Sequence, residues 1–233
     1  MAAEPWGSPI ARRALWAAVL GSGMAFLDGT IVNVALPSIG EDLDADLTGL
    51  QWILDAYLVT LTSLLLLGGA LGDRYGRRRV FEVGVWLFTA ASVLCGLAPT
   101  TEALIAARAL QGVGGALLVP GSLALLSATM RADDRARAIG AWSGLTGAAS
   151  AVGPLFGGWL IDAASWRWAF LINVPLSAAV LVTVRAVPES VDSDAPAHID
   201  VPGAVTAAAG LGLLTAGLIA GGDEWSSLAV GMA

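Results

Sequence analysis

Three ionisable residues, Asp28, Asp55 and Arg108, lie inside long apolar stretches of the sequence. Charged side chains within membrane spans are rare, and they usually face a bundle interior or an aqueous cavity beside a counter-charge. Because a helix rises 1.5 Å per residue, Asp28, Arg108 and Asp55 would lie roughly 12, 9 and 7 Å from the same membrane face. This overlap in depth predicts that Arg108 pairs with Asp28 or with Asp55.

Such a pair could work as a proton switch. Desolvation raises the pKa of a carboxylic acid and a nearby guanidinium lowers it, so a cavity that alternates between these environments would bind and release a proton. We predict Asp28 as the proton carrier, and a static structural ion pair between Asp28 and Arg108 is the alternative. For Asp55, which lies nearer the interface, a hydrated boundary residue is the favoured interpretation. Asp55 also belongs to a part-polar stripe with Gln51 and Thr62, which would line a cavity or hydrogen-bond to another helix.

The elements that must position these residues are seven apolar stretches, each near or above the roughly 20 residues that cross a bilayer as a helix. The composition agrees, since 56% of the residues are hydrophobic and only 13% are charged. The first stretch is too long for a signal-peptide core and carries Asp28 in its interior. The predicted spans are Ala14–Leu36, Leu50–Leu71, Val80–Ala98, Glu102–Ser127, Ala138–Ile161, Trp168–Val187 and Gly203–Gly222.

Prolines mark several of the expected boundaries. Pro37 is predicted to end the first span and Pro188 the sixth, and the polar, acidic segment after Pro188 is predicted to be a linker. The expected organisation is a cytoplasmic N-terminal tail (1–13), a six-helix bundle (14–187), a cytoplasmic linker (188–202), and a seventh membrane helix with a truncated continuation (203–233).

The arginines predict the orientation of these spans. All twelve basic residues are arginine, and ten fall on one side of the predicted membrane, against Arg167 alone on the other. Positive residues are enriched in cytoplasmic loops, so we expect a multi-pass protein of the cell membrane with a cytoplasmic N-terminus. Trp52, Trp166 and Trp168 are expected in an aromatic belt at the outer boundary. The ten arginines are Arg12, Arg13, Arg74, Arg77, Arg78, Arg79, Arg131, Arg135, Arg137 and Arg185.

The loop between the second and third spans combines glycines, one acid and several arginines. Glycines permit a sharp turn, and an aspartate at a helix end can accept charge-assisted hydrogen bonds from a neighbouring arginine or helix N-terminus. An ordinary positive-inside loop is the alternative. The residues that we assign to this cytoplasmic gate motif are Gly69, Asp73, Arg74, Gly76, Arg77 and Arg78.

The full string of that loop resembles the loop signature of the major facilitator superfamily, Gly-x-x-x-Asp-Arg-x-Gly-Arg-Arg. Three further strings agree with it. Residues 27–37 resemble the first-helix motif of the fourteen-helix drug:proton antiporters, and the string that holds Arg108, Gln111 and Gly112 resembles the superfamily's fourth-helix motif. The fifth-helix antiporter motif is similar to Gly153, Pro154, Gly157 and Gly158, with Ala149 where that pattern usually has glycine.

This resemblance implies an all-α polytopic membrane protein with a major-facilitator-type six-helix N-terminal bundle plus one further transmembrane helix. It also implies proton-coupled export of small hydrophobic or cationic substrates, with the proton as coupling ion and Arg108 as the modulator of Asp28. Pro154 is expected to kink the fifth helix. The small residues of that helix would serve gating between two halves, or plain close packing; they are Gly140, Gly144, Ala149, Gly153 and Gly157.

Other functions find less support. A truncated or split half-transporter, which acts only with a missing C-terminal half or partner chain, is the main alternative. An intramembrane enzyme would need Ser/His, metal-ligand or paired-aspartate signatures, and none is present. No metal or other cofactor is expected, because the chain has one cysteine, Cys95, and one histidine, His198. Nucleic-acid binding is not expected, because topology explains the arginines. Membrane lipid is an expected partner, and Asn173 is expected to be a packing hydrogen-bond donor and not a substrate contact.

Overall fold

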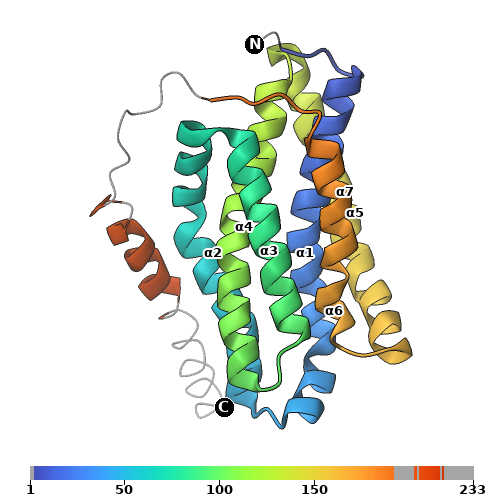
Figure 1. The fold of residues 1–233 in the computed structure, drawn as a ribbon, viewed down its shortest axis with the longest axis vertical. Coiled ribbons are helices and arrows are strands. Elements are labelled where there is room, and N and C mark those ends of the chain that lie inside the picture. Colours follow the sequence, from blue (N-terminus) through green and yellow to red (C-terminus); the bar gives the residue numbers. More distant parts are fainter. Residues whose placement is uncertain (1–2, 192–201, 204, 216, 218–233) are drawn as a thin grey trace, which may run out of the picture.

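The computed structural model describes residues 3–191, 202, 203, 205–215 and 217, and its long helices stand side by side as a bundle (Figure 1). Within these residues, five helices are long and apolar enough to cross a membrane. The sixth position is taken by two consecutive short helices, Trp168–Val184 in all. In chain order the helices are α1 (Pro9–Leu43), α2 (Leu47–Tyr75), α3 (Arg77–Gly96), α4 (Thr101–Thr129), α5 (Ala132–Ala163), α6 (Trp168–Leu171) and α7 (Asn173–Val184).

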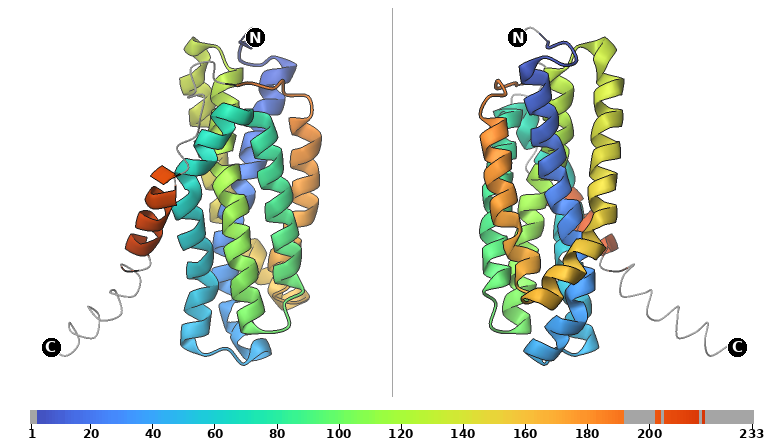
Figure 2. Two further views of the ribbon diagram at one scale, coloured as in Figure 1. Left: turned by 60° about the vertical axis from the view of Figure 1, so that its left-hand side comes forward. Right: turned by 90° about the vertical axis from the view of Figure 1, so that its right-hand side faces the viewer.

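Five of the predicted spans are thus confirmed as single helices, and the sixth is present as two consecutive short helices. The seventh, Gly203–Gly222, is described only in part, at residues 203, 205–215 and 217, and the described residues form a short apolar helix, Val205–Thr215. The N-terminal segment, the α2–α3 turn, the α4–α5 turn and the end of α7 lie at one end of the bundle (Figures 1 and 2). We call this the arginine-rich end, because the ten arginines named above lie at or near it.

Local sequence explains why the helices begin where they do. The side chains of Ser8, Asp46 and Thr100 cap α1, α2 and α4, and each accepts a hydrogen bond from the backbone N–H three residues on, at 3.1, 2.7 and 3.2 Å. These caps satisfy N–H groups that have no partner within their own helix. Gly76 alone separates α2 from α3, and its φ of 110° lies in a region that favours glycine.

The structure differs from the predicted spans at two places, and both concern a proline. Pro37 does not end the first span: α1 continues to Leu43 and stops where Asp44 adopts a left-handed φ of 49°. A proline removes a single bond, here to the carbonyl of Asn33, and membrane helices tolerate that loss. The predicted sixth span is interrupted at Ile172, because Pro175 lacks the N–H that would bond to the carbonyl of Leu171.

The N-terminal segment lies against the α4–α5 turn. The backbone N–H of Glu4 donates to the carbonyl of Thr129 at 2.8 Å, and the N–H of Arg131 donates to the carbonyl of Glu4 at 3.0 Å. The backbone N–H of Trp6 donates to Asp134 at 2.9 Å. The predicted tail, residues 1–13, therefore includes a docked segment and, from Pro9, the first turn of α1.

The prediction for Trp166 was also wrong. Its side chain is only 3% exposed, and its indole N–H donates to the carboxylate of Asp42 at 3.0 Å. Trp166 therefore joins α1 to the segment before α6 and does not lie in a lipid-facing belt. Trp52 and Trp168 are each 48% exposed, as a belt requires.

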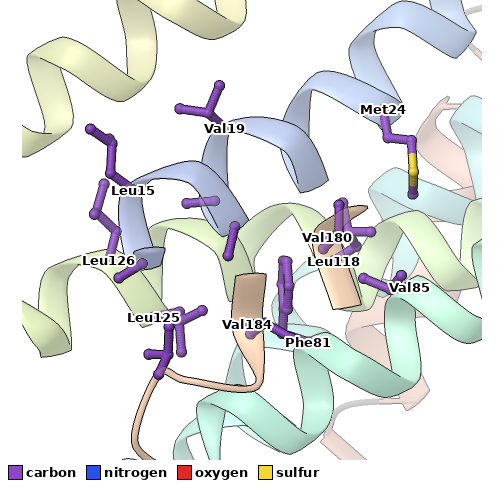
Figure 3. Close-up of a cluster of buried hydrophobic side chains, with 14 of the residues drawn as sticks. Leu15, Val19, Met24, Phe81, Val85, Leu118, Leu125, Leu126, Val180 and Val184 are labelled. Atoms are coloured by element: carbon purple, nitrogen blue, oxygen red, sulfur yellow. The ribbon is translucent and has the colours of Figure 1, made fainter. Parts of the chain in front are cut away.

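Two apolar clusters fill the bundle, one above the other. The cluster nearer the arginine-rich end joins α1, α3, α4 and α7 and is shown in Figure 3. The second cluster fills the opposite end and includes Ile31, Ile39, Ile53, Leu104 and Phe170. On α1, the first cluster ends at Ala25 and the second begins at Ile31, so Asp28 lies at the level where they meet. Among the labelled residues of Figure 3 are Leu15, Val19, Met24, Phe81, Val85, Leu118, Leu125, Leu126, Val180 and Val184.

Glycines let α4 approach its neighbours closely around that level. A Cβ on Gly112 would come within 2.6 Å of the Tyr57 carbonyl on α2, and a Cβ on Gly114 within 2.5 Å of the Phe88 backbone N on α3. Small residues at such contacts are how membrane helices approach one another. The backbone of α4 is therefore held against α2 and α3 immediately after Arg108.

Candidate functional site

A buried ion pair joins α1 to α4 in the middle of the bundle. One terminal nitrogen of Arg108 lies 2.5 Å from Oδ2 of Asp28, and the two side chains are 1% and 0% exposed. The prediction that Arg108 pairs with Asp28 or Asp55 is thus confirmed, with Asp28 as the partner. Asp55 lies on α2 and is half-buried.

The rest of the Arg108 side chain is held by α2. Its Nε donates to the carbonyl of Ile53 at 3.0 Å, and its guanidinium carbon lies 4.2 Å from the centre of the Tyr57 ring. The face of an aromatic ring attracts a cation, and this attraction grows when water is excluded. Arg108 is therefore fixed on three sides, by α1, by α2 and by its own helix.

Gln111 closes the pair from the same face of α4. It follows Arg108 by three residues, which places both side chains on one side of the helix. Its Oε1 accepts a hydrogen bond from the Arg108 guanidinium at 2.7 Å, and its Nε2 donates to Oδ1 of Asp28 at 2.7 Å. The Gln111 amide thus bridges the ion pair, with its oxygen toward the Arg108 cation and its nitrogen toward the Asp28 anion.

Further polar groups from α3 and α7 complete the site. Asn173 donates through Nδ2 to Oδ1 of Asp28 at 3.2 Å and to the hydroxyl of Ser92 at 3.1 Å. The Nε2 of Gln111 also donates to the Ser92 hydroxyl at 2.9 Å. The thiol of Cys95 in turn donates to Oε1 of Gln111 at 3.5 Å. We call Asp28, Arg108, Gln111, Ser92 and Asn173 the central polar cluster; all five are buried and together they join α1, α3, α4 and α7.

One atom of this cluster lacks a partner. Oδ1 of Asn173 is buried and has no hydrogen-bond partner among the residues that the structure describes. A buried acceptor without a donor costs roughly 1–3 kcal/mol. The carboxylate of Asp28 has its partners: it accepts three hydrogen bonds and donates none, an arrangement that suits its ionised form.

The sequence pointed to Asp28, Arg108 and Gln111, but it did not point to Ser92 and Asn173 as members of the same cluster, nor to Cys95 beside it. Asn173 was expected to be a packing donor, and it does donate, but to Asp28. The signal that could have found Ser92 and Asn173 is weak, because neutral polar residues are common in membrane helices and carry no obligatory counter-charge.

The gate motif forms a separate network at the arginine-rich end. Arg77 pairs with Asp73 at 2.8 Å across the α2–α3 turn, and Arg78 pairs with Glu82 at 2.8 Å along α3. Gly76 is needed at this turn, but Gly69 is not, because a Cβ there would meet nothing. The neighbouring Gly68 instead packs against the Ala116 carbonyl of α4.

Glu189, predicted to begin a linker, caps this turn. Its two carboxylate oxygens accept hydrogen bonds from the backbone N–H groups of Arg78 and Arg79 at 3.0 and 3.1 Å. An acid at a helix N-terminus satisfies unpaired donors and complements the helix dipole. The segment after α7 is thereby tied to the start of α3.

The fifth-helix motif packs α5 against α1 through only part of its length. A Cβ on Gly153 would meet the Thr30 hydroxyl, and one on Gly157 would lie 2.9 Å from Ile31. Gly140 and Gly144 have open space around them, so the close approach predicted for them is not present in this structure. Gly158 and Pro154 lie on the same stretch, Pro154 with its ring exposed.

The arrangement defines a class: a polytopic helical membrane protein whose buried charges are held inside an apolar bundle. The sequence matches the Major Facilitator Superfamily over residues 18–229. The chain belongs to this superfamily.

Relatives of known name agree with this assignment. The chain is 42% identical over 204 residues to the methylenomycin A resistance protein of Bacillus subtilis (strain 168), a match that covers 87% of this chain and 43% of that protein. It is 43% identical over 225 residues to the probable actinorhodin transporter of Streptomyces coelicolor, covering 93% and 38% of the two chains. The chain thus spans about two fifths of the length of these relatives.

Solved structures show the same fold. A peptide transporter in complex with sulfate superposes with a TM-score of 0.69 at 19% identity, covering 91% of this chain and 46% of that one. A bacterial homologue of the human lysosomal transporter Spinster superposes with a TM-score of 0.66 at 21% identity, covering 84% and 47%. At this level of identity the likeness concerns the fold alone.

Proposed function

We propose that this chain is the N-terminal portion of a proton-coupled exporter of hydrophobic or cationic small molecules, of the fourteen-helix drug:proton antiporter kind. The observation that carries the proposal is the ion pair of Asp28 and Arg108, which lies between two apolar clusters and is not on the surface. Relatives named for resistance to antibiotics, or for their transport, support a substrate of that chemical type.

The central polar cluster offers a physical route for coupling. In the described state Asp28 accepts hydrogen bonds from Arg108, Gln111 and Asn173. A proton on Asp28 would remove the anion that holds Arg108, and would turn one carboxylate oxygen into a donor. Release of Arg108 would loosen the only ion pair that joins α1 to α4 among the described residues, and so couple protonation to helix movement.

Asn173 is suited to follow that proton. Rotation of its amide would bring Oδ1, which now lacks a partner, to the place that Nδ2 occupies beside Asp28. There Oδ1 could accept the hydrogen bond of the protonated acid. The rotation would pair Oδ1 but would move Nδ2 away from Asp28 and Ser92, so the two arrangements of the amide differ in which atom of Asn173 is paired.

The exposure of α2 and α5 supports a larger assembly. In their most apolar windows only 22% and 17% of residues are buried, compared with 61% for α1 and 56% for α4. Major facilitator transporters place two similar bundles around a midplane site. We propose that the second half of the transporter packs along α2 and α5. In this arrangement residues 1–13 are the N-terminal segment and residues 14–187 the bundle. Residues 188–202 are then the linker, and residues 203–233 begin the continuation.

We further propose that the arginine-rich end faces the cytoplasm and that the protein resides in the cell membrane, as the arginine distribution favours. The gate motif, with Arg74 beside the Asp73–Arg77 pair, would then act at the cytoplasmic side. Asp55 remains a second candidate for proton binding, half-buried on α2.

The test is drug export by the intact protein in everted membrane vesicles energised by a pH gradient. Export should stop in Asp28→Asn and in Arg108→Gln, and should persist in Asp55→Asn. Export that is unchanged in Asp28→Asn would eliminate Asp28 as the carrier.

A half-transporter that acts only with a partner chain is the second candidate. Translation of the adjoining downstream sequence decides between them. About seven further spans in the same reading frame would support the single-chain exporter, and a stop followed by a separate gene for those spans would support the partner chain.

A further inference from the structure

Two grooves lie beside α7, which packs against both α1 and α3. The first has a volume of about 340 Å³ and runs between α3 and α7. The second has a volume of about 240 Å³ and lies between the first turns of α1 and the end of α7. Apart from arginines at the arginine-rich end, the linings are apolar side chains and three hydroxyl residues, Thr89, Ser177 and Thr183.

The larger groove has the length of one lipid chain in one leaflet. Along α7 and its C-cap residue, the lining runs from Val174 to Arg185, and a helix rises roughly 16 Å over that separation. This matches about half of the 30 Å hydrocarbon thickness of a bilayer. Trp86 of α3 lines the groove, and its side chain is 60% exposed. An acyl chain would therefore fit along the groove with its headgroup at the level of Arg185.

The polar end of both grooves is cationic. Arg185 lines the larger groove, and Arg12 and Arg13 line the smaller one beside Trp16. All three arginines are exposed, and no ion pair within the described part of the chain involves them. Two other arginines at this end, Arg77 and Arg78, are instead neutralised by Asp73 and Glu82.

We propose that the two grooves form a binding site for one anionic phospholipid of the leaflet that adjoins the arginine-rich end. Its acyl chains lie in the grooves on either side of α7, and its phosphate is held by Arg12, Arg13 and Arg185. A guanidinium binds phosphate oxygens through paired hydrogen bonds, and basic pockets between membrane helices select anionic headgroups. A zwitterionic lipid would fill the same grooves but would bring no net charge to these three arginines, which form no ion pair with the described residues.

The test uses the purified chain in detergent with equimolar phosphatidylglycerol and phosphatidylcholine, and counts the retained lipids by native mass spectrometry. The protein with its native sequence should retain more phosphatidylglycerol than phosphatidylcholine. Arg185→Gln should lower that preference about fivefold. Adding Arg12→Gln and Arg13→Gln to the same protein should lower it by about fivefold more for each arginine removed. Ala178→Phe, which fills the larger groove from its exposed side, should lower retention of both lipids.

Arg135→Gln is the matched control, because Arg135 is exposed at the same end but lines neither groove. It should leave the lipid preference within twofold. Protection of the buried Cys95 thiol from a maleimide reagent checks that each variant is folded. Equal loss in Arg135→Gln and Arg185→Gln would overturn the site, since the preference would then come from the general charge of this end. No preference in the native sequence would overturn it as well.

Discussion

Removal of Arg108 isolates the energetic role of the buried ion pair. Arg108→Met keeps much of the side-chain volume but leaves the Asp28 carboxylate without its counter-charge, held only by the amides of Gln111 and Asn173. Breaking a buried pair by removing one partner costs about 3–5 kcal/mol. Asp28→Leu should cost a comparable amount, because it leaves the guanidinium buried between the Ile53 carbonyl and Gln111.

The paired replacement should recover most of that loss. With Arg108→Met and Asp28→Leu together, no buried charge remains, and the amides of Gln111 and Asn173 still donate to the Ser92 hydroxyl. We expect the double variant to lie within about 2 kcal/mol of the native protein, the order of one unsatisfied polar group. In this double-mutant cycle, the interaction free energy between Asp28 and Arg108 should therefore be several kcal/mol.

The single cysteine provides the assay. Cys95 is buried next to the central polar cluster, so its reaction with a maleimide reports opening of this part of the bundle. A loss of 3–5 kcal/mol should accelerate labelling by roughly two to three and a half orders of magnitude. Arg135→Met, an exposed arginine, is the control and should change nothing. A double variant that labels as fast as either single variant, or an Arg108→Met protein as protected as the native one, would refute the reasoning.

Three further predictions concern the packing and the turns. Gly114→Ala should cost about 1–3 kcal/mol in the free energy of unfolding, because its Cβ would meet the Phe88 backbone, whereas Gly140→Ala should be neutral; equal effects would contradict the packing of α4 on α3. Glu189→Ala should cost about 1 kcal/mol by uncapping α3, and Glu189→Gln less, as measured by urea unfolding; an unaffected Glu189→Ala would show that the cap contributes nothing. Gly153→Val should lower the thermal midpoint by forcing α5 away from Thr30, and Gly144→Val should not; the reverse order would mean that α5 faces α1 through a different side.

The spans and the ion pair were open to prediction from sequence for physical reasons. Long apolar runs must be helical in a bilayer, and the few charges inside them must find one another. Depth alone left Asp28 and Asp55 open as partners of Arg108, because depth says nothing of the direction in which a side chain points. That direction follows from the packing of α4 on α2 and α1.

The remaining features depend on contacts between distant residues. Asn173 reaches Asp28 across 145 positions of the chain, and Glu189 caps α3 across 110 or 111 positions. Trp166 is buried because Asp42 offers its indole an acceptor. None of these pairings has a local pattern in the sequence, since each is set by which helix ends meet.

The central claim is that Asp28 carries the coupling proton. The most direct test is proton release by the intact purified transporter on addition of substrate, measured with a pH indicator in weakly buffered detergent solution. The account predicts that the native protein and Asp55→Asn release protons and that Asp28→Asn releases none while still binding substrate. Undiminished proton release from Asp28→Asn would contradict it.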